Sequence, residues 1–164
     1  MLNCFDLMSR AANMFAEKYR YAYFYGAKGQ ILTMPRMEAL IKAEPEYFSK
    51  YSREEINRII AYSEDKIGYD CSGFIMAVSG IQSWSTGYYE MSLHKTTPAA
   101  GTWGNILYTT YGGTGRHIGL DIGQGRFLHM GREGDTVEMG LIKEFPWEHS
   151  GQLPGISYFL TGDR

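Results

Sequence analysis

The sequence predicts an α+β fold, with helices in the first half of the chain and an antiparallel sheet in the second. Up to about residue 80, apolar residues recur at three- and four-residue spacing, as in amphipathic helices. From Asn105 onward the apolar period changes to two, and glycines divide the chain into strand-length segments. The length of 164 residues and the 44% apolar content are typical of one globular domain, so we expect residues 1–164 to form a single domain.

The first half contains several helix signals. Pro35 and Pro45 each suit a first helical turn, and Ser52 begins a capping-box pattern, so residues 35–64 are predicted to form two or three short helices. Before them, the aromatic stretch 21–29 ends in glycines that break regular structure. An earlier helix is predicted from apolar residues on one face, namely Leu2, Phe5, Met8, Ala12, Phe15, Ala16 and Tyr19.

A further short helix is predicted to begin at Cys71, because Asp70 is a favourable N-cap and Gly80 a favourable C-terminal stop. Residues 81–104 are rich in Ser, Thr, Gly and Tyr, and we expect them to form a long surface connection. The strand candidates that follow are 105–111, 116–123, 126–130, 137–142 and 156–160.

Composition argues against several classes of function. The formal net charge of -2 does not favour a nucleic acid or an anionic membrane as partner, and no stretch is long and apolar enough to span a bilayer. The two cysteines, Cys4 and Cys71, lie in dissimilar surroundings, so neither a disulfide nor a zinc site is expected. We expect a monomer without metal or cofactor. The N-terminus lacks the basic and apolar segments of a signal peptide.

Cys71 is the candidate nucleophile. Unpaired N–H groups and the helix dipole stabilise a thiolate in a first helical turn, so a lowered thiol pKa is expected, although Asp70 acts against it. A lone cysteine is more often a small buried hydrophobe, and this alternative stays open. Ser72 is a weaker candidate, because a serine-hydrolase elbow has Gly where this chain has Asp70.

Two strand histidines are candidates for the base and for the group that orients it. His117 alternates with Ile118 and Leu120, so its side chain points away from the core. His129 shares that face if Gly123–Gly125 forms a three-residue hairpin loop, whereas a two-residue loop would place it on the opposite face. The need for a base and an orienter leads us to predict the three-residue loop.

Three segments together resemble the NlpC/P60 family of papain-like cell-wall cysteine peptidases. They are Asp70-Cys71-Ser72-Gly73-Phe74, His117-Ile118-Gly119-Leu120-Asp121-Ile122-Gly123 and Gly125-Arg126-Phe127-Leu128-His129. Upstream, Tyr23-Phe24-Tyr25-Gly26-Ala27 is similar to the family's Tyr-Val-Trp-Gly-Gly, and Gly104-Asn105-Ile106 to its Gly-Asp-Leu. The chain departs from the pattern at Tyr25, Ala27 and Asn105, and by a helical insertion at about residues 30–66.

The resemblance implies a fold of N-terminal helices on a five- to six-stranded antiparallel sheet, and roles for particular residues. Cys71 would be the nucleophile, His117 the base and His129 the orienting residue, while Tyr23 would lie near the oxyanion. Asp70 and Ser72 would receive the free amine of a stem peptide, with Tyr25 and Arg116 as further substrate contacts.

The implied activity is hydrolysis of the D-glutamyl-diaminopimelate or D-glutamyl-lysine bond in peptidoglycan stem peptides through an acyl-enzyme. Two alternatives remain open: an N-acetylmuramoyl-L-alanine amidase or other papain-like amidohydrolase, and a non-catalytic wall-binding or immunity module. Without a signal peptide, a phage or prophage lysin is the favoured setting, ahead of a secreted effector or a domain separated from its leader.

Overall fold

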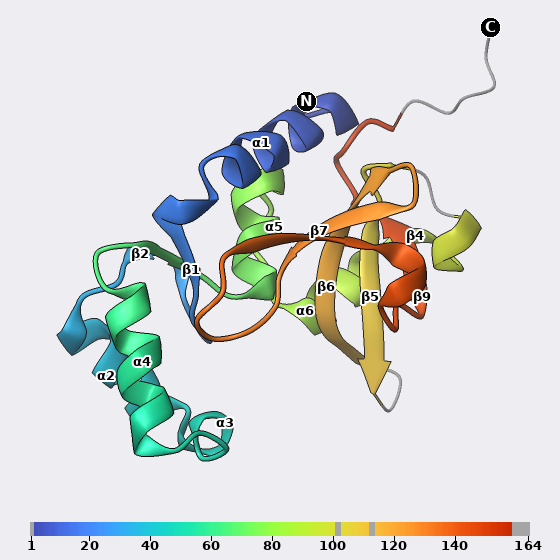
Figure 1. Cartoon of the computed structure of the whole chain (residues 1–164). Helices are drawn as coiled ribbons and strands as arrows, with labels where there is room; N and C mark the ends of the chain where they lie inside the picture. The colour runs from blue at the N-terminus through green and yellow to red at the C-terminus, as the bar shows by residue number, and fades with distance from the viewer. Residues whose placement is uncertain (1, 101–102, 112–113, 159–164) are drawn as a thin grey trace, which may run out of the picture.

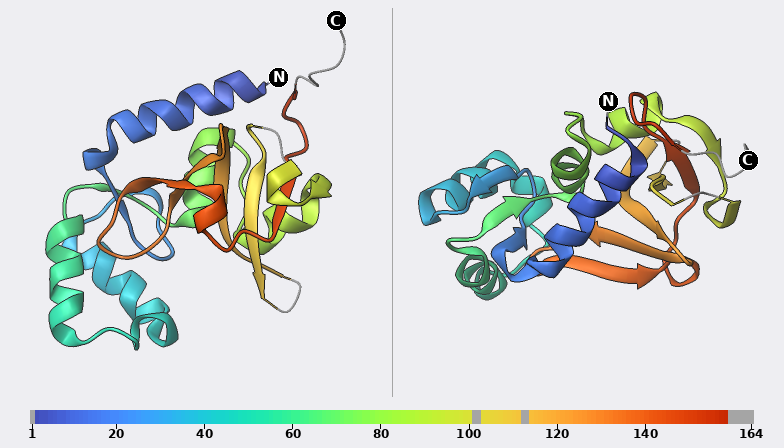
Figure 2. Two further views of the ribbon diagram at one scale, coloured as in Figure 1. Left: turned by 45° about the vertical axis from the view of Figure 1, so that its right-hand side comes forward. Right: turned by 90° about the horizontal axis from the view of Figure 1, so that it is seen from above.

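A computed structural model describes residues 2–100, 103–111 and 114–158. Helices cover one face of a large antiparallel sheet, and a separate group of short helices lies at the other end of the molecule (Figures 1 and 2). The predicted α+β class, with its helices on a six-stranded antiparallel sheet, is therefore confirmed. Among the described residues, no helix is both long and apolar enough to cross a bilayer.

The large sheet has the strand order β4-β9-β5-β6-β7-β8, and every pair of neighbours is antiparallel. Its strands are β4 (Leu93–Thr96), β5 (Ile106–Tyr111), β6 (Thr114–Gly123), β7 (Arg126–Met130), β8 (Val137–Leu141) and β9 (His149–Gln152). The covering helices are α1 (Cys4–Ala16), α5 (Cys71–Ser79) and α6 (Ser85–Met91).

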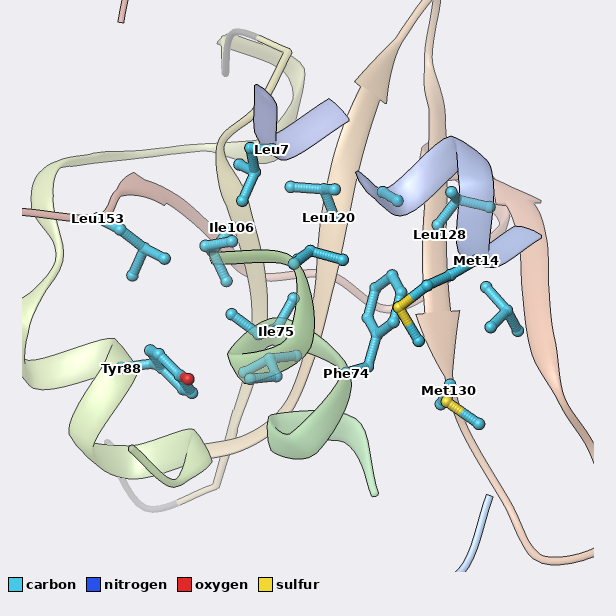
Figure 3. Close-up of a cluster of buried hydrophobic side chains, with 14 of the residues drawn as sticks. Leu7, Met14, Phe74, Ile75, Tyr88, Ile106, Leu120, Leu128, Met130 and Leu153 are labelled. Atoms are coloured by element: carbon cyan, nitrogen blue, oxygen red, sulfur yellow. The ribbon is translucent and has the colours of Figure 1, made fainter. Parts of the chain in front are cut away.

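The main core lies between these three helices and the sheet (Figure 3). Phe74 and Ile75 of α5 are fully buried against Leu120 of β6, because their apolar faces meet where the helix crosses the sheet. Burial of each such side chain stabilises the fold by about 1.5–3 kcal/mol. The core thereby fixes the first turn of α5, and with it Cys71, against the sheet.

The face that α1 buries differs from the predicted one. The buried residues are Cys4, Leu7, Ala11 and Met14, whereas Phe5 is 55% exposed and makes an edge-on contact with the Trp103 ring. Two adjacent stripes of apolar residues on α1 both have three- and four-residue spacing. Packing against α5 buries the stripe that was not predicted to be buried.

The insertion is helical, as predicted, and comprises α2 (Met34–Ala43), α3 (Pro45–Phe48) and α4 (Arg53–Ser63). The capping box at Ser52 is formed with Glu55. These helices pack around a second core with Phe24 and Leu32, beside a small sheet ordered β1-β3-β2 that the sequence analysis did not predict. Its strands are β1 (Tyr21–Tyr23), β2 (Lys28–Ile31) and β3 (Ile67–Tyr69).

Two other sequence predictions are wrong. Residues 81–104 are not merely a surface connection, since they contain α6 and β4, and Tyr88 of α6 is fully buried. Among the described residues the last strand is β9, and the described part of the predicted strand 156–160 is not a strand. Ser157 forms only an isolated bridge to Asn3, and residues 159 and 160 lie outside the described ranges. A short apolar run near the chain end resembles a strand, but the place beside β5 is occupied by β9, which is itself covered by β4.

The β6–β7 hairpin places His117 and His129 on one face of the sheet, as expected, but its loop is not the predicted one. Gly123 pairs with Arg126, so the loop has two residues, Gln124 and Gly125, both with positive φ as a type I′ turn requires. The predicted three-residue loop is therefore wrong. A register shift between Asp121 and Gly123 adds one residue to β6, and this bulge returns His117 and His129 to one face.

Candidate active site

Cys71 is the first residue of α5, and local contacts fix this helix start. The Asp70 side chain accepts a hydrogen bond from the Gly73 N–H at 2.7 Å, as an N-cap does, and Gly80 ends the helix with φ of 72°. A side chain at Gly73 would lie 2.8 Å from the Ala27 carbonyl oxygen, so only glycine allows this close approach. Both predicted helix signals are confirmed.

The environment of the Cys71 thiol favours its neutral form. Burial, followed by the charge of Asp70, raises the thiol pKa to about 12. Hydrogen bonds from the backbone N–H groups of Ile118 and Ser72 and the charge of Lys28 act in the opposite direction but do not prevail. The expectation of a lowered pKa is therefore wrong, because desolvation outweighs the helix dipole here. The contact with the Ile118 backbone places the Cys71 sulfur against β6. Ile118 directly follows His117 in the sequence.

His117 and His129 lie side by side on the face of the sheet opposite the helices. His117 Nε2 is 2.8 Å from His129 Nδ1, and His129 Nε2 is 3.5 Å from Glu138 Oε2 on the neighbouring strand. At 3.5 Å the Glu138 carboxylate is within ion-pair range of His129 Nε2, and the tautomers of the two rings decide which of them donates the 2.8 Å hydrogen bond. When His117 Nε2 is the donor, His117 Nδ1 carries a free lone pair, as a general base requires.

Aromatic side chains surround this pair. The Trp147 ring stacks on His117 at 5.5 Å and 13°, and Phe145 contacts both imidazoles. Burial lowers the pKa of His117 to about 3 and that of His129 to about 4, with the neighbouring His129 adding to the shift at His117. Both imidazoles are therefore neutral near pH 7. Gly119 makes room for Trp147, since a side chain there would lie 2.9 Å from the indole.

Tyr23 is buried on β1, and the β7–β8 loop holds this segment in place. The Tyr23 N–H donates to the Asp135 carbonyl and the Tyr25 N–H to Glu133 Oε1, each at 2.8 Å. Burial and the nearby Cys71 raise the pKa of the Tyr23 hydroxyl, so it stays protonated and can donate a hydrogen bond. Tyr23 is thus close enough to Cys71 for their charges to interact.

The insertion reaches this part of the molecule through Tyr47. Its ring stacks on Tyr25, with centroids 3.8 Å apart and an angle of 11°, and its hydroxyl hydrogen-bonds to that of Tyr23. Beside it, burial raises the pKa of Glu133 to about 8. The insertion therefore contributes directly to the surroundings of Tyr23.

The predicted substrate-contact residues have different environments. Asp70 and Ser72 are buried and both contact the Lys28 ammonium. Tyr25 is half-buried under Tyr47, and Arg116 is exposed at a bulge in β6 beside His117.

A pocket of roughly 510 Å³ opens beside the histidines and includes Arg132, Glu138 and Phe145 in its lining. A larger pocket of roughly 650 Å³, beside Trp103 and Ile142, is lined by neither the histidines nor Cys71, so it does not bear on this chemistry. Within the described ranges, no cluster of His, Cys, Asp and Glu is arranged to bind a metal ion.

A family model described as the NlpC/P60 family matches residues 57–152, more than half of the chain. The chain belongs to the NlpC/P60 family. The matched residues include Cys71, His117 and His129, whereas Tyr23 and most of the insertion lie outside them. The resemblance seen in the sequence motifs is thereby confirmed.

Among curated proteins, this NlpC/P60 chain is 30% identical over 86 residues to the "Probable peptidoglycan endopeptidase LytE" of Bacillus subtilis (strain 168). The match covers 49% of the chain but only 25% of the relative, so the chain corresponds to about a quarter of that protein.

Solved structures establish the same fold at low sequence identity. The NlpC/p60 domain of the peptidoglycan hydrolase SagA matches with a TM-score of 0.58 and 18% identity, over 93% of this chain and 100% of that domain. RipB, a peptidoglycan hydrolase of Mycobacterium tuberculosis, matches with a TM-score of 0.59 and 14% identity, over 92% of this chain and 66% of that one. RipD of the same organism is described as a non-catalytic NlpC/p60 domain protein. It matches with a TM-score of 0.55 and 14% identity, over 89% of this chain and 96% of that one.

Several residues of the site were not found from the sequence. Glu138 and Trp147 reach the histidines only through strand register and packing, and Tyr47 and Lys28 only through the fold of the insertion and β2. Their local sequence carries no signal of such a role. The indications that the surroundings had changed were the departures from the family pattern at Tyr25, Ala27 and Asn105 and the predicted helical insertion at about residues 30–66.

Proposed function

We propose that this NlpC/P60 chain is a cysteine peptidase that hydrolyses peptidoglycan stem peptides at the D-glutamyl-diaminopimelate or D-glutamyl-lysine bond. The observation that carries the proposal is the hydrogen bond between His117 of β6 and His129 of β7, with Glu138 of β8 beyond it, on the sheet whose β6 backbone contacts the Cys71 sulfur at Ile118. A non-catalytic module has no need of an imidazole whose base nitrogen is fixed in this way. The identity to a probable peptidoglycan endopeptidase supports the choice of substrate.

In the proposed first step, the Cys71 thiol attacks the scissile carbonyl carbon while His117 Nδ1 takes its proton. Burial keeps thiol and imidazole neutral beforehand, so proton transfer accompanies the attack rather than preceding it as a stable ion pair. His129 accepts the His117 Nε2–H hydrogen bond and stabilises the imidazolium that forms. The attack thus creates one negative charge on the oxyanion and one positive charge on His117.

The oxyanion needs donors that are already in place. The Cys71 backbone N–H and the protonated Tyr23 hydroxyl are the candidates, and each such donor typically contributes a factor of about 10²–10³. The tetrahedral adduct then collapses as His117 returns its proton to the leaving amine, which breaks the peptide bond and leaves a thioester on Cys71. Water, deprotonated by His117, hydrolyses the thioester and restores the thiol.

Mass spectrometry of muropeptides tests the proposal. Purified cell wall is digested with the unmodified chain, with Cys71→Ser and with Cys71→Ala, and the new ends are identified. We expect new amino termini on diaminopimelate or lysine with the unmodified chain alone. Release of a lactyl end would instead indicate an amidase. Binding to the wall without any cleavage would indicate a binding module, and both results would overturn the peptidase proposal.

A further inference from the structure

An ion pair occupies the position beside the nucleophile where the family resemblance led us to expect a substrate amine. Lys28 Nζ lies 2.5 Å and 2.7 Å from the two carboxylate oxygens of Asp70, and it also contacts Ser72 Oγ. Asp70 Oδ1 further accepts hydrogen bonds from Ser72 Oγ at 2.9 Å and from the Gly73 N–H at 2.7 Å. The Asp70 side chain is only 10% exposed, whereas that of Lys28 is 37% exposed.

These contacts engage all three donors of the Lys28 ammonium, while Asp70 Oδ1 has three partners and Asp70 Oδ2 has one. An ammonium has three N–H donors, and here its partners are the two Asp70 oxygens and Ser72 Oγ. The carboxylate charge is balanced by a cation from the chain itself. A substrate ammonium brought to Asp70 would meet Lys28 at close range and would lose its hydration without gaining a free carboxylate.

The backbone explains why Lys28 can reach this position. Lys28 begins β2 and pairs with Tyr69 of β3, the strand that leads directly into Asp70 and Cys71. The Asp70 N–H in turn donates to the Ala27 carbonyl at 2.9 Å. The lysine is therefore held beside Asp70 by main-chain pairing on both sides, and its placement does not depend on the long side chain alone.

We infer that Lys28 takes the place of a substrate amino group, so that the site accepts stem peptides whose amino end is acylated rather than free. This inference rests on the proposed function, since it concerns the stem peptide that the site binds. An acylated amino end presents a neutral amide, which neither repels Lys28 nor requires the Asp70 charge. Acylated stem peptides are those still attached to the glycan, so the substrate class is uncleaved wall rather than released peptide.

Binding to the inactive Cys71→Ala chain tests the inference without requiring catalysis. Isothermal titration compares L-alanyl-γ-D-glutamyl-diaminopimelate carrying a free amine with the same peptide N-acetylated. We expect the acetylated peptide to bind at least about tenfold more tightly, the scale of one charge-assisted hydrogen bond. Tighter binding of the free amine would overturn the inference, because it would mean that the substrate displaces Lys28. Failure of both peptides to bind would overturn it too.

Variants at Lys28 assign the preference to the ammonium. Added to Cys71→Ala, Lys28→Met should shift the ratio of the two affinities toward the free amine by about ten- to a hundredfold, because Asp70 then lacks its partner. Lys28→Arg keeps the cation and should keep the preference, and Lys42→Met, at an exposed lysine of α2, is the matched control. If Lys28→Met does not fold, the affinities of the two peptides for Cys71→Ala and for Cys71→Ala with Lys28→Arg still test whether the site prefers the acetylated peptide.

Cleavage by the active chain reports separately on the proposed function. If the active chain releases no new amino termini from wall while Cys71→Ala prefers the acetylated peptide, the peptidase proposal fails and the assignment of Lys28 stands. If wall is cleaved but the free-amine peptide binds more tightly, the assignment fails and the peptidase proposal stands.

Discussion

His117 Nε2 lies 2.8 Å from His129 Nδ1, and Glu138 extends this contact from the adjacent strand. The three side chains come from three consecutive strands, β6, β7 and β8, so sheet register alone brings them together. In the proposed mechanism each has a distinct part: His117, on the strand that the Cys71 sulfur contacts, is the base, His129 orients His117, and Glu138 orients His129.

Replacing these residues one at a time should produce a graded loss of activity. His117→Ala removes the proposed base and should lower kcat/KM by about 10²–10⁴ or more, as expected for general acid–base catalysis. His129→Ala should leave a measurable remnant, and Glu138→Gln should cost least, since each acts through its neighbour. Steady-state cleavage of wall fragments measures the series, with His149→Ala on β9 as the matched control. Equal losses in all three variants would contradict the ordering.

The reactivity of Cys71 should follow that of a neutral thiol. Because burial raises its pKa to about 12, the rate of alkylation by iodoacetamide should rise about tenfold per pH unit from pH 7 to 9, without a plateau. An ordinary thiol, such as glutathione, begins to level off near its pKa of about 8.5. Mass spectrometry separates Cys71 from the buried Cys4. A plateau below pH 8 would mean that a stable thiolate exists at rest.

Glu133 should make stability fall as the pH rises. Its folded pKa, raised to about 8 by burial, lies above its ordinary value, so its contribution is fully present below about pH 4.5. That contribution is lost between about pH 4.5 and 8, at up to about 1.4 kcal/mol per pH unit. Glu133→Gln, which mimics the protonated acid, should therefore unfold at a higher temperature than the unmodified chain at pH 8 but not at pH 4.5.

The buried histidines act in the opposite sense over a lower range. Their folded pKa values, about 3 for His117 and about 4 for His129, lie below the ordinary value of about 6.5. Their contribution is complete above about pH 6.5 and is lost as the pH falls through about 4 for His129 and about 3 for His117. Melting temperatures of Glu133→Gln, measured as a function of pH, should show this loss of stability at low pH without the contribution of Glu133. An unchanged pH dependence in that variant would show that Glu133 is ionised in the folded chain.

Gly119 should be required for the position of Trp147. In Gly119→Ala the new methyl group would lie 2.9 Å from the indole and 3.1 Å from the Leu128 carbonyl, so the ring must leave the His117 face. We expect a stability loss of about 1–3 kcal/mol, typical of overpacking, together with lower activity. Trp147→Phe combined with Gly119→Ala should recover part of the stability, because a smaller ring leaves room. If the double variant is no more stable than Gly119→Ala, the indole is not the obstacle.

Signals confined to a few neighbouring residues were sufficient to predict much of this fold. Asp70 and Gly80 mark the ends of α5 through capping chemistry that depends only on adjacent backbone groups, and the Ser52 capping box behaves in the same way. The alternation around His117 likewise showed which way its side chain points. These features involve no contact with distant parts of the chain.

Features that depend on tertiary contacts could not be predicted from the sequence. Two stripes of α1 satisfy the same spacing, and only packing against α5 selects between them. The bulge in β6 offsets the two-residue loop, although nothing local distinguishes it from the three-residue loop that was predicted. Lys28 and Tyr47 belong to the site because the small sheet and the insertion fold back onto it.

Tyr47 links the insertion to the chemistry, and removing its hydroxyl should show this. Tyr47→Phe keeps the ring stacked on Tyr25 but deletes the hydrogen bonds of its hydroxyl to Tyr23, Tyr51 and Glu133, so stability should fall by about 1–3 kcal/mol while kcat falls several-fold. Tyr23→Phe should cost about 10²–10³ if its hydroxyl holds the oxyanion. Once that hydroxyl is gone, Tyr47→Phe should have no further effect, so the two losses should not add. Tyr62→Phe on α4 is the matched control, and additive losses would mean that Tyr47 acts independently of Tyr23.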